Sequence, residues 1–172
     1  MPGNLAIDRR VTPGLLLRER EMLEGWLEFH RITLTAKSEG LTDQQRKERP
    51  VTTSKLSLHA LIRHLAEVER YWFRIVLNGE LEAQRIWADP TVHDSEMYPL
   101  SGANWGEDLA AWEAECDASR QAAARHELDD VGMRGNQSCS LRWIYMHMIQ
   151  EYARHNGHAD LIREMIDGAV GR

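Results

Sequence analysis

Apolar side chains recur every three or four residues in four separate segments, which is the period of an amphipathic α-helix. The predicted helices span residues from about 15 to 37, 58 to 77, 104 to 126 and 141 to 166. No segment alternates apolar and polar residues for long enough to predict a strand. Four long helices without strands predict an all-α fold, an antiparallel four-helix bundle.

Residues with capping and helix-ending propensity support these boundaries. Ser57 is placed to cap the second helix, and Asn78-Gly79 is placed to end it. Asn104 opens the third helix, and Asp167-Gly168 closes the fourth. The non-periodic stretch 80–104 is the longest connection, and a connection this long in a small domain is usually a covering flap.

Length and charge restrict the class of protein. The chain has 172 residues, enough for one domain over residues 1–172, and a formal net charge of -6. An acidic chain lacks the electrostatic footprint of a nucleic-acid binder. No apolar run approaches the roughly 18 residues of a membrane span, and the N-terminus lacks a signal-peptide core. We therefore expect a cytoplasmic protein without nucleic-acid or membrane partners, in which Cys116 and Cys139 are reduced, structural thiols.

Three polar residues interrupt the apolar stripes. His155 lies near the middle of the apolar face of the fourth helix, and Glu151 lies one turn earlier on the same side. His64 borders the stripe of the second helix, and His147 and His158 follow the edge that carries Glu151. Two ligands on one helix and a third on its neighbour make a three-ligand metal site with open coordination positions. A divalent cation would also offset the cost of burying Glu151 as a charge.

A simpler interpretation competes with the metal site. A histidine near an apolar face is more often a hydrogen-bonded core residue than a ligand, and the Glu-x-x-x-His spacing is common by chance. A bundle that binds no metal therefore remains one hypothesis.

Tryptophans divide into two groups by their expected positions. We expect core positions for Trp26, Trp72, Trp112 and Trp143, and pocket or dimer-seam positions for Trp87 and Trp105.

Two segments resemble a known family. SLHALIRHLAEVERYWFRIVLNGE and SLRWIYMHMIQEYARHNGHADLIREMIDG resemble the second and fourth helices of the DinB-like superfamily, in particular its DUF664 branch. The resemblance covers nearly the whole chain and implies a bundle, often dimeric, with a metal held by three side chains. Many members use three histidines, whereas Glu151 replaces the second here. This departure resembles the N-terminal domain of mycothiol-dependent maleylpyruvate isomerase and implies the ligand set His64, Glu151 and His155, with His158 behind it.

The resemblance also implies a function. It suggests a metal-dependent thiol S-transferase or isomerase that uses a low-molecular-weight thiol of the mycothiol type and a small electrophile. Zinc is the first expected metal and nickel the second. The protein is expected to be a homodimer, with His158 or His147 orienting a ligand or moving a proton. The alternative is a non-catalytic, metal-pinned dimeric bundle that acts as a sensor or interaction protein.

Arginines on the helices add a further hypothesis about the substrate. Arg63, Arg142 and Arg154 are candidate anchors for a carboxylated substrate. The competing interpretation is a solvated helix face, which is the more common position for arginine. The sequence does not identify the substrate or a catalytic residue.

Overall fold

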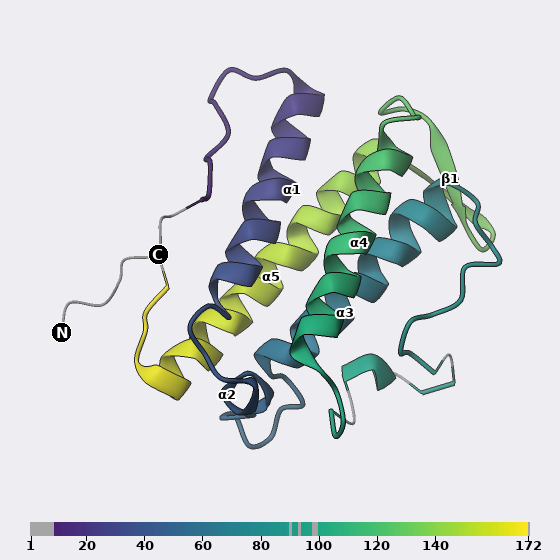
Figure 1. The fold of residues 1–172 in the computed structure, drawn as a ribbon. Helices are drawn as coiled ribbons and strands as arrows, with labels where there is room; N and C mark the ends of the chain where they lie inside the picture. The colour runs from purple at the N-terminus through teal and green to yellow at the C-terminus, as the bar shows by residue number, and fades with distance from the viewer. Residues whose placement is uncertain (1–8, 90, 93, 98–99, 172) are drawn as a thin grey trace.

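Four long helices lie side by side in the computed structural model, which describes residues 9–89, 91–92, 94–97 and 100–171 (Figure 1). They are α1 (Glu19–Ala36), α3 (Leu58–Glu69) continued by the π-helix η1 (Arg70–Leu77), α4 (Trp105–Ala123) and α5 (Leu141–Asp167). The connections contain α2 (Asp43–Lys47), the 3-10 helix η2 (Ser95–Met97) and the strands β1 (Val131–Arg134) and β2 (Gln137–Ser140). The predicted all-α bundle is confirmed.

The helix directions decide which side chains can meet. Helices α3 and α5 are antiparallel, since His64 faces His155 with ring centroids 4.8 Å apart and Trp72 faces His147 at 4.6 Å. Helices α3 and α4 run in the same direction, because the chain between them returns along the bundle before α4 begins (Figure 1). The long connection 78–104 is therefore a consequence of the topology, and it passes beside α3.

The apolar stripes of the helices form one core. Its largest fully buried side chains come from α1, α3, η1 and α5, and include Leu27, Leu61, Ile62, Leu65, Phe73, Ile144 and Met148. Full burial of a leucine or isoleucine contributes about 1.5–3 kcal/mol, so the stripes are the main source of stability. None of the described helices combines the length and hydropathy needed to cross a bilayer.

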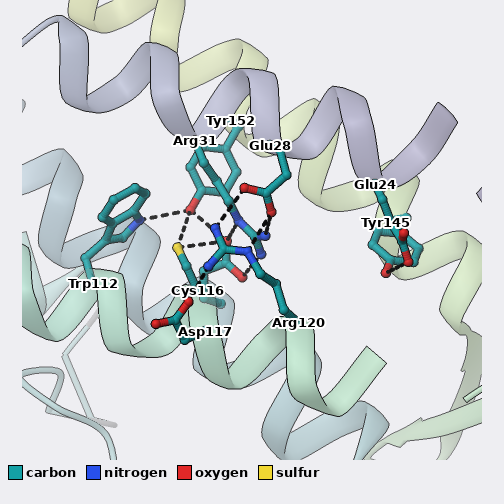
Figure 2. Close-up of polar contacts among 10 residues, drawn as sticks. Glu24, Glu28, Arg31, Trp112, Cys116, Asp117, Arg120, Tyr145 and Tyr152 are labelled. Carbon is teal, nitrogen blue, oxygen red and sulfur yellow. Dashed lines mark hydrogen bonds and ion pairs between the residues drawn. The ribbon is translucent and has the colours of Figure 1, made fainter. Parts of the chain in front are cut away.

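A cluster of polar side chains, here called the central polar cluster, joins the four helices inside this core (Figure 2). Arg31 of α1 donates from Nε to Glu69 Oε1 at 2.8 Å and from Nη2 to Glu69 Oε2 at 2.6 Å. The Tyr152 hydroxyl of α5 donates to Glu69 Oε1 at 2.7 Å and accepts from Trp112 Nε1 of α4 at 2.9 Å. All four side chains are buried. Each of the four long helices therefore contributes one buried side chain to the same hydrogen-bonded cluster.

The first helix begins later than predicted. Its first residue is Glu19, because the Arg18 N–H donates to Glu21 Oε2 at 3.3 Å and sets the first turn there. Leu15 and Leu16, expected inside the helix, precede it and are 92% and 99% exposed. The other ends agree with prediction: Ser57 and Asn104 cap α3 and α4, and Gly168 ends α5 in the left-handed conformation.

The polar connection before α5 contains a β-hairpin, which corrects the expectation of no strand. Strands β1 and β2 are antiparallel and turn at Gly135, whose φ is +58°. The hairpin packs closely on η1, since a Cβ at Gly132 would lie 2.2 Å from the Val76 carbonyl oxygen. Cys139 lies on β2 rather than at the helix start, and burial raises the pKa of its thiol.

Tryptophan positions agree only in part with the prediction. Trp72 and Trp112 are buried as expected, whereas Trp143 is 45% exposed on the outer side of α5. Trp105, expected beside a pocket or a dimer seam, is buried as the first residue of α4. Trp87 lies partly buried, with the Arg63 guanidinium 4.9 Å from its ring centroid.

The cytoplasmic location and the single domain over residues 1–172 stay predictions, and residues 1–8 lie outside the described part.

Candidate functional site

The three predicted ligands come together between α3 and α5. One ligand atom each of His64, Glu151 and His155 lies within 4.8 Å of the others. In a tetrahedral zinc site with bonds of about 2.0–2.2 Å, neighbouring ligand atoms lie roughly 3.4 Å apart. Small side-chain movements therefore bring these three atoms to coordination distance. The antiparallel pairing of the two helices is what places His64 opposite the Glu151 and His155 turn.

A cleft of about 950 Å³ opens onto these three residues. Their side chains line it, with 17% of His64, 13% of Glu151 and 7% of His155 exposed, so that His155 is buried and the other two are partly buried. Aromatic and cationic side chains contribute to its walls, and these are Tyr71, Trp72, Lys55, Arg85, Arg134 and Arg154. The volume lies at the upper end of the range of small-molecule sites, about 300–1,000 Å³.

His155 has a buried ring nitrogen without a hydrogen-bond partner among the described residues. Its Nδ1 lies 3.3 Å from His158 Nδ1, and burial lowers its pKa despite the nearby Glu151 carboxylate. Its Nε2 is buried and has no hydrogen-bond partner among the described residues; Glu151 Oε2, 3.4 Å away, is not aligned for one. An unsatisfied buried polar atom costs about 1–3 kcal/mol. A proton on Nε2 points toward the Glu151 carboxylate, whereas a proton donated from Nδ1 to His158 leaves the Nε2 lone pair available to a cation.

Glu151 is ionised and already has one cationic partner. The contact with His155, followed by the Arg154 guanidinium, outweighs burial and lowers the pKa of Glu151 to about 2. Arg154 donates to Glu151 Oε2, so a metal is not the sole means of stabilising this carboxylate. Two imidazoles and a carboxylate form a donor set that suits zinc or a neighbouring first-row cation. The residues present therefore fit a metal, and the metal site stays a prediction.

The two histidines predicted behind the ligands both line the cleft. His158 contacts His155, as described above. His147 stacks on Trp143, with ring centroids 5.0 Å apart and planes 7° from parallel, and its Nε2 lies 3.9 Å from Glu151 Oε1. Burial lowers the pKa of His147, so its ring is neutral at physiological pH and can accept a proton.

Glu96 is a site residue that the sequence did not predict. It belongs to η2, and its Oε1 lies 2.7 Å from His64 Nδ1. Together with Asp94, it forms a second group of possible ligand atoms around His64, again within 4.8 Å of one another. No periodicity or spacing marks Glu96 in the sequence, because it lies in an irregular connection whose path depends on tertiary contacts.

The arginines suggested as anion anchors have acidic partners. Arg63 Nε donates to Asp108 Oδ2 at 2.6 Å, Arg142 pairs with Glu19 and Asp129, and Arg154 pairs with Glu151. Of the three, Arg154 alone lines the cleft. Lys55 and Arg134 also line it, and neither has an acidic partner within the described part of the chain. The Arg134 guanidinium instead lies 5.3 Å from the centroid of the Trp72 ring.

An all-α bundle with histidine and glutamate side chains gathered between two antiparallel helices is the architecture that the DinB-like resemblance implies. A model of the mycothiol-S-transferase family matches residues 22–168. The chain therefore belongs to the mycothiol-S-transferase family, a DinB-like family, and the resemblance is confirmed. No curated protein and no solved structure matches the chain.

Proposed function

We propose that this protein is a metal-dependent thiol S-transferase that joins mycothiol to a small electrophile. The supporting observation is the convergence of His64, Glu151 and His155 at the base of a cleft, with the buried His155 Nε2 lacking a hydrogen-bond partner among the described residues. The family description names the thiol and the reaction class. Zinc is the first metal proposed and nickel the second.

The chain's own residues divide the work. His64, Glu151 and His155 would hold the cation, and the cleft that they line has room for a thiol and a co-substrate. With a divalent cation bound, the site would lower the pKa of a coordinated thiol, so that the thiol would be ionised at neutral pH. His158 holds the His155 ring in one tautomer through the contact between their Nδ1 atoms.

His147 is the proposed proton acceptor. Its ring is neutral and lies in the same cleft, where it takes the proton that the thiol releases. The thiol sulfur then forms a bond to the electrophilic carbon, and the leaving group departs with the electron pair of the broken bond. Stacking on Trp143 and contact with Trp72 restrict the orientation of the His147 ring.

A non-catalytic, metal-pinned bundle is the second function considered. A structural zinc site is closed by four protein ligands, whereas a catalytic site keeps an open position. The cleft that opens onto the three side chains favours the catalytic alternative. Metal and thiol binding measured on the same sample separates the two, because a structural site would bind metal and no thiol.

Elemental analysis combined with native mass spectrometry tests the proposal. The purified protein should carry one divalent cation per chain and gain mass with added mycothiol, compared with glutathione and bacillithiol. His64→Ala, Glu151→Ala and His155→Ala should each sharply reduce metal content, because each removes one of three ligands. A wild-type protein that binds neither metal nor thiol under these conditions would contradict the proposed function.

His147 and His158 supply matched controls on the same helix. His147→Ala should leave metal content nearly intact and slow conjugation by about 10²–10⁴-fold, since it removes a proton acceptor. His158→Ala should cause a smaller loss of metal than a ligand substitution does. If these two variants lose the metal while Glu151→Ala keeps it, the ligand assignment is wrong.

A further inference from the structure

Glu96 makes a direct contact with the candidate ligand His64. The carboxylate is 7% exposed, and its Oε1 lies 2.7 Å from His64 Nδ1. A carboxylate can only accept a hydrogen bond, so His64 donates its Nδ1 proton. The proton on Nδ1 leaves Nε2 as the nitrogen whose lone pair is available to a cation.

We infer that Glu96 is a positioning residue that sets the tautomer and ring orientation of His64 for the metal, an inference that rests on the proposed function. Histidines that bind metals usually donate their other N–H to a carboxylate, a carbonyl or water, and loss of that partner weakens metal binding about 10–100-fold. His64 and Glu96 have this arrangement in the protein. Glu96 thus joins the site without being one of its three ligands.

The segment that carries Glu96 is anchored to the helix that carries His64. Glu67 lies one turn after His64 on α3, and its Oε1 accepts hydrogen bonds from three consecutive backbone N–H groups, those of residues 86, 87 and 88, at 2.7, 2.7 and 3.0 Å. Asp94 has a φ of +56°, a left-handed conformation immediately before η2. These features place Glu96 relative to α3 through backbone contacts as well as through its own side chain.

Metal binding and docking of the connection are therefore coupled. If the docked connection raises metal affinity through Glu96, the metal must stabilise the docked connection by the same factor, because coupling between two equilibria is reciprocal. The amides held by Glu67 report on this docking directly. Zinc should slow hydrogen exchange at residues 86–88, and Glu67→Gln should weaken zinc binding although Glu67 belongs to neither possible ligand group.

The competing arrangement uses Glu96 as a ligand. His64, Asp94 and Glu96 form the second group of possible ligand atoms, so a cation bound there would exclude Glu151 and His155 from coordination. The two arrangements differ in what Glu96 does to the coordination sphere. Loss of a positioning residue weakens binding and leaves the ligands unchanged, whereas loss of a ligand alters the coordination itself.

Cobalt(II) titration of the metal-free protein, followed by visible absorption and zinc competition, distinguishes these roles. Glu96→Ala should weaken cobalt binding about 10–100-fold with the wild-type band positions retained. Glu96→Gln keeps an acceptor for the His64 proton, so its cobalt affinity should lie between those of wild type and Glu96→Ala. Glu82→Ala, an exposed glutamate on the same connection, is the control and should bind like wild type. Unchanged affinity in Glu96→Ala, or shifted bands, would overturn the inference.

A tautomer measurement separates failure of this inference from failure of the proposed function. In metal-free wild-type protein, the imidazole nitrogen shifts of His64 should report a proton on Nδ1, and Glu96→Ala should abolish this preference. A wild-type protein without cobalt affinity would refute the proposed function while this readout still tests the Glu96 contact. An Nε2-protonated His64 in wild type would refute the positioning role whatever the metal content.

Discussion

Removal of the Glu69 carboxylate from the central polar cluster should strongly destabilise the protein. Glu69 is fully buried and accepts two hydrogen bonds from Arg31 and one from Tyr152. The Glu69 carboxylate raises the pKa of Arg31 although burial opposes the charge, and burial raises the pKa of Tyr152. In Glu69→Leu, the Arg31 charge and the Tyr152 hydroxyl both lose a buried partner.

The contacts of Arg31 set the expected loss in the free energy of unfolding for Glu69→Leu. Breaking a buried ion pair by removing one partner costs about 3–5 kcal/mol. Arg31 keeps a second acidic contact, from Nη1 to Glu28 Oε1 at 2.5 Å, so the lower end of this range is expected. A loss of about 3 kcal/mol lowers the melting temperature of a domain of this size by roughly 6–12 °C. Glu28→Gln is the matched control and should cost about 1 kcal/mol or less, because that carboxylate is partly exposed.

Urea unfolding followed by circular dichroism measures these effects. The double variant Arg31→Met with Glu69→Leu replaces the pair by apolar side chains and should be less destabilised than the sum of its two single variants by about 2 kcal/mol or more. Additive losses would mean that the two side chains are not energetically coupled. A cost below about 1 kcal/mol for Glu69→Leu alone would refute the argument from burial.

Three further predictions concern pH, packing and assembly. Because folding lowers the pKa of Glu151 to about 2, its stabilising contribution is complete above about pH 5 and is lost as the pH falls through about 2, so acid unfolding of metal-free Glu151→Gln should show a weaker pH dependence than wild type. Gly132→Ala should destabilise the hairpin by about 1–3 kcal/mol through its clash with η1, whereas Gly157→Ala in α5 meets open space and should be neutral or stabilising, which thermal unfolding will measure. The protein is expected to sediment as a homodimer at micromolar concentration, and a monomer would contradict the dimer prediction.

The sequence predicted the bundle because its helices carry regular apolar stripes. The convergence of the three candidate ligands was predictable for the same reason: His155 and Glu151 interrupt one stripe and His64 borders another, so the antiparallel pairing of α3 and α5 brings them together. Helix ends with capping residues were also accurate, as at Ser57. The spacing of residues along the sequence was sufficient to predict a side chain's position wherever that position depends only on which face of one helix carries it.

Other features depended on contacts that local sequence does not encode. Leu15 and Leu16 fit a helical stripe but lie outside the helix because the first turn is set at Glu19. The strands of the hairpin have four residues each, too short for a recognisable alternation. Glu96 reaches His64 through the path of an irregular connection. The helical period did not mark Trp143 as solvent-exposed, since aromatic side chains are common at both kinds of position.

The π-helical segment η1 holds one residue more than an α-helix would need to reach the hairpin. Its wider turn is visible in the bond from the Asn78 N–H to the Phe73 carbonyl, 3.2 Å long and five residues back. Removing one residue from η1 would restore α-helical bonding and leave the orientation of the following residues relative to His64 nearly unchanged, because the wider π-helical turn absorbs one extra residue. The turn that carries Val76 and Leu77, against which Gly132 packs, would then stay beside the hairpin. A natural relative with a one-residue gap here can therefore seat its hairpin, and the wall of its cleft, in the same way with an uninterrupted α-helix.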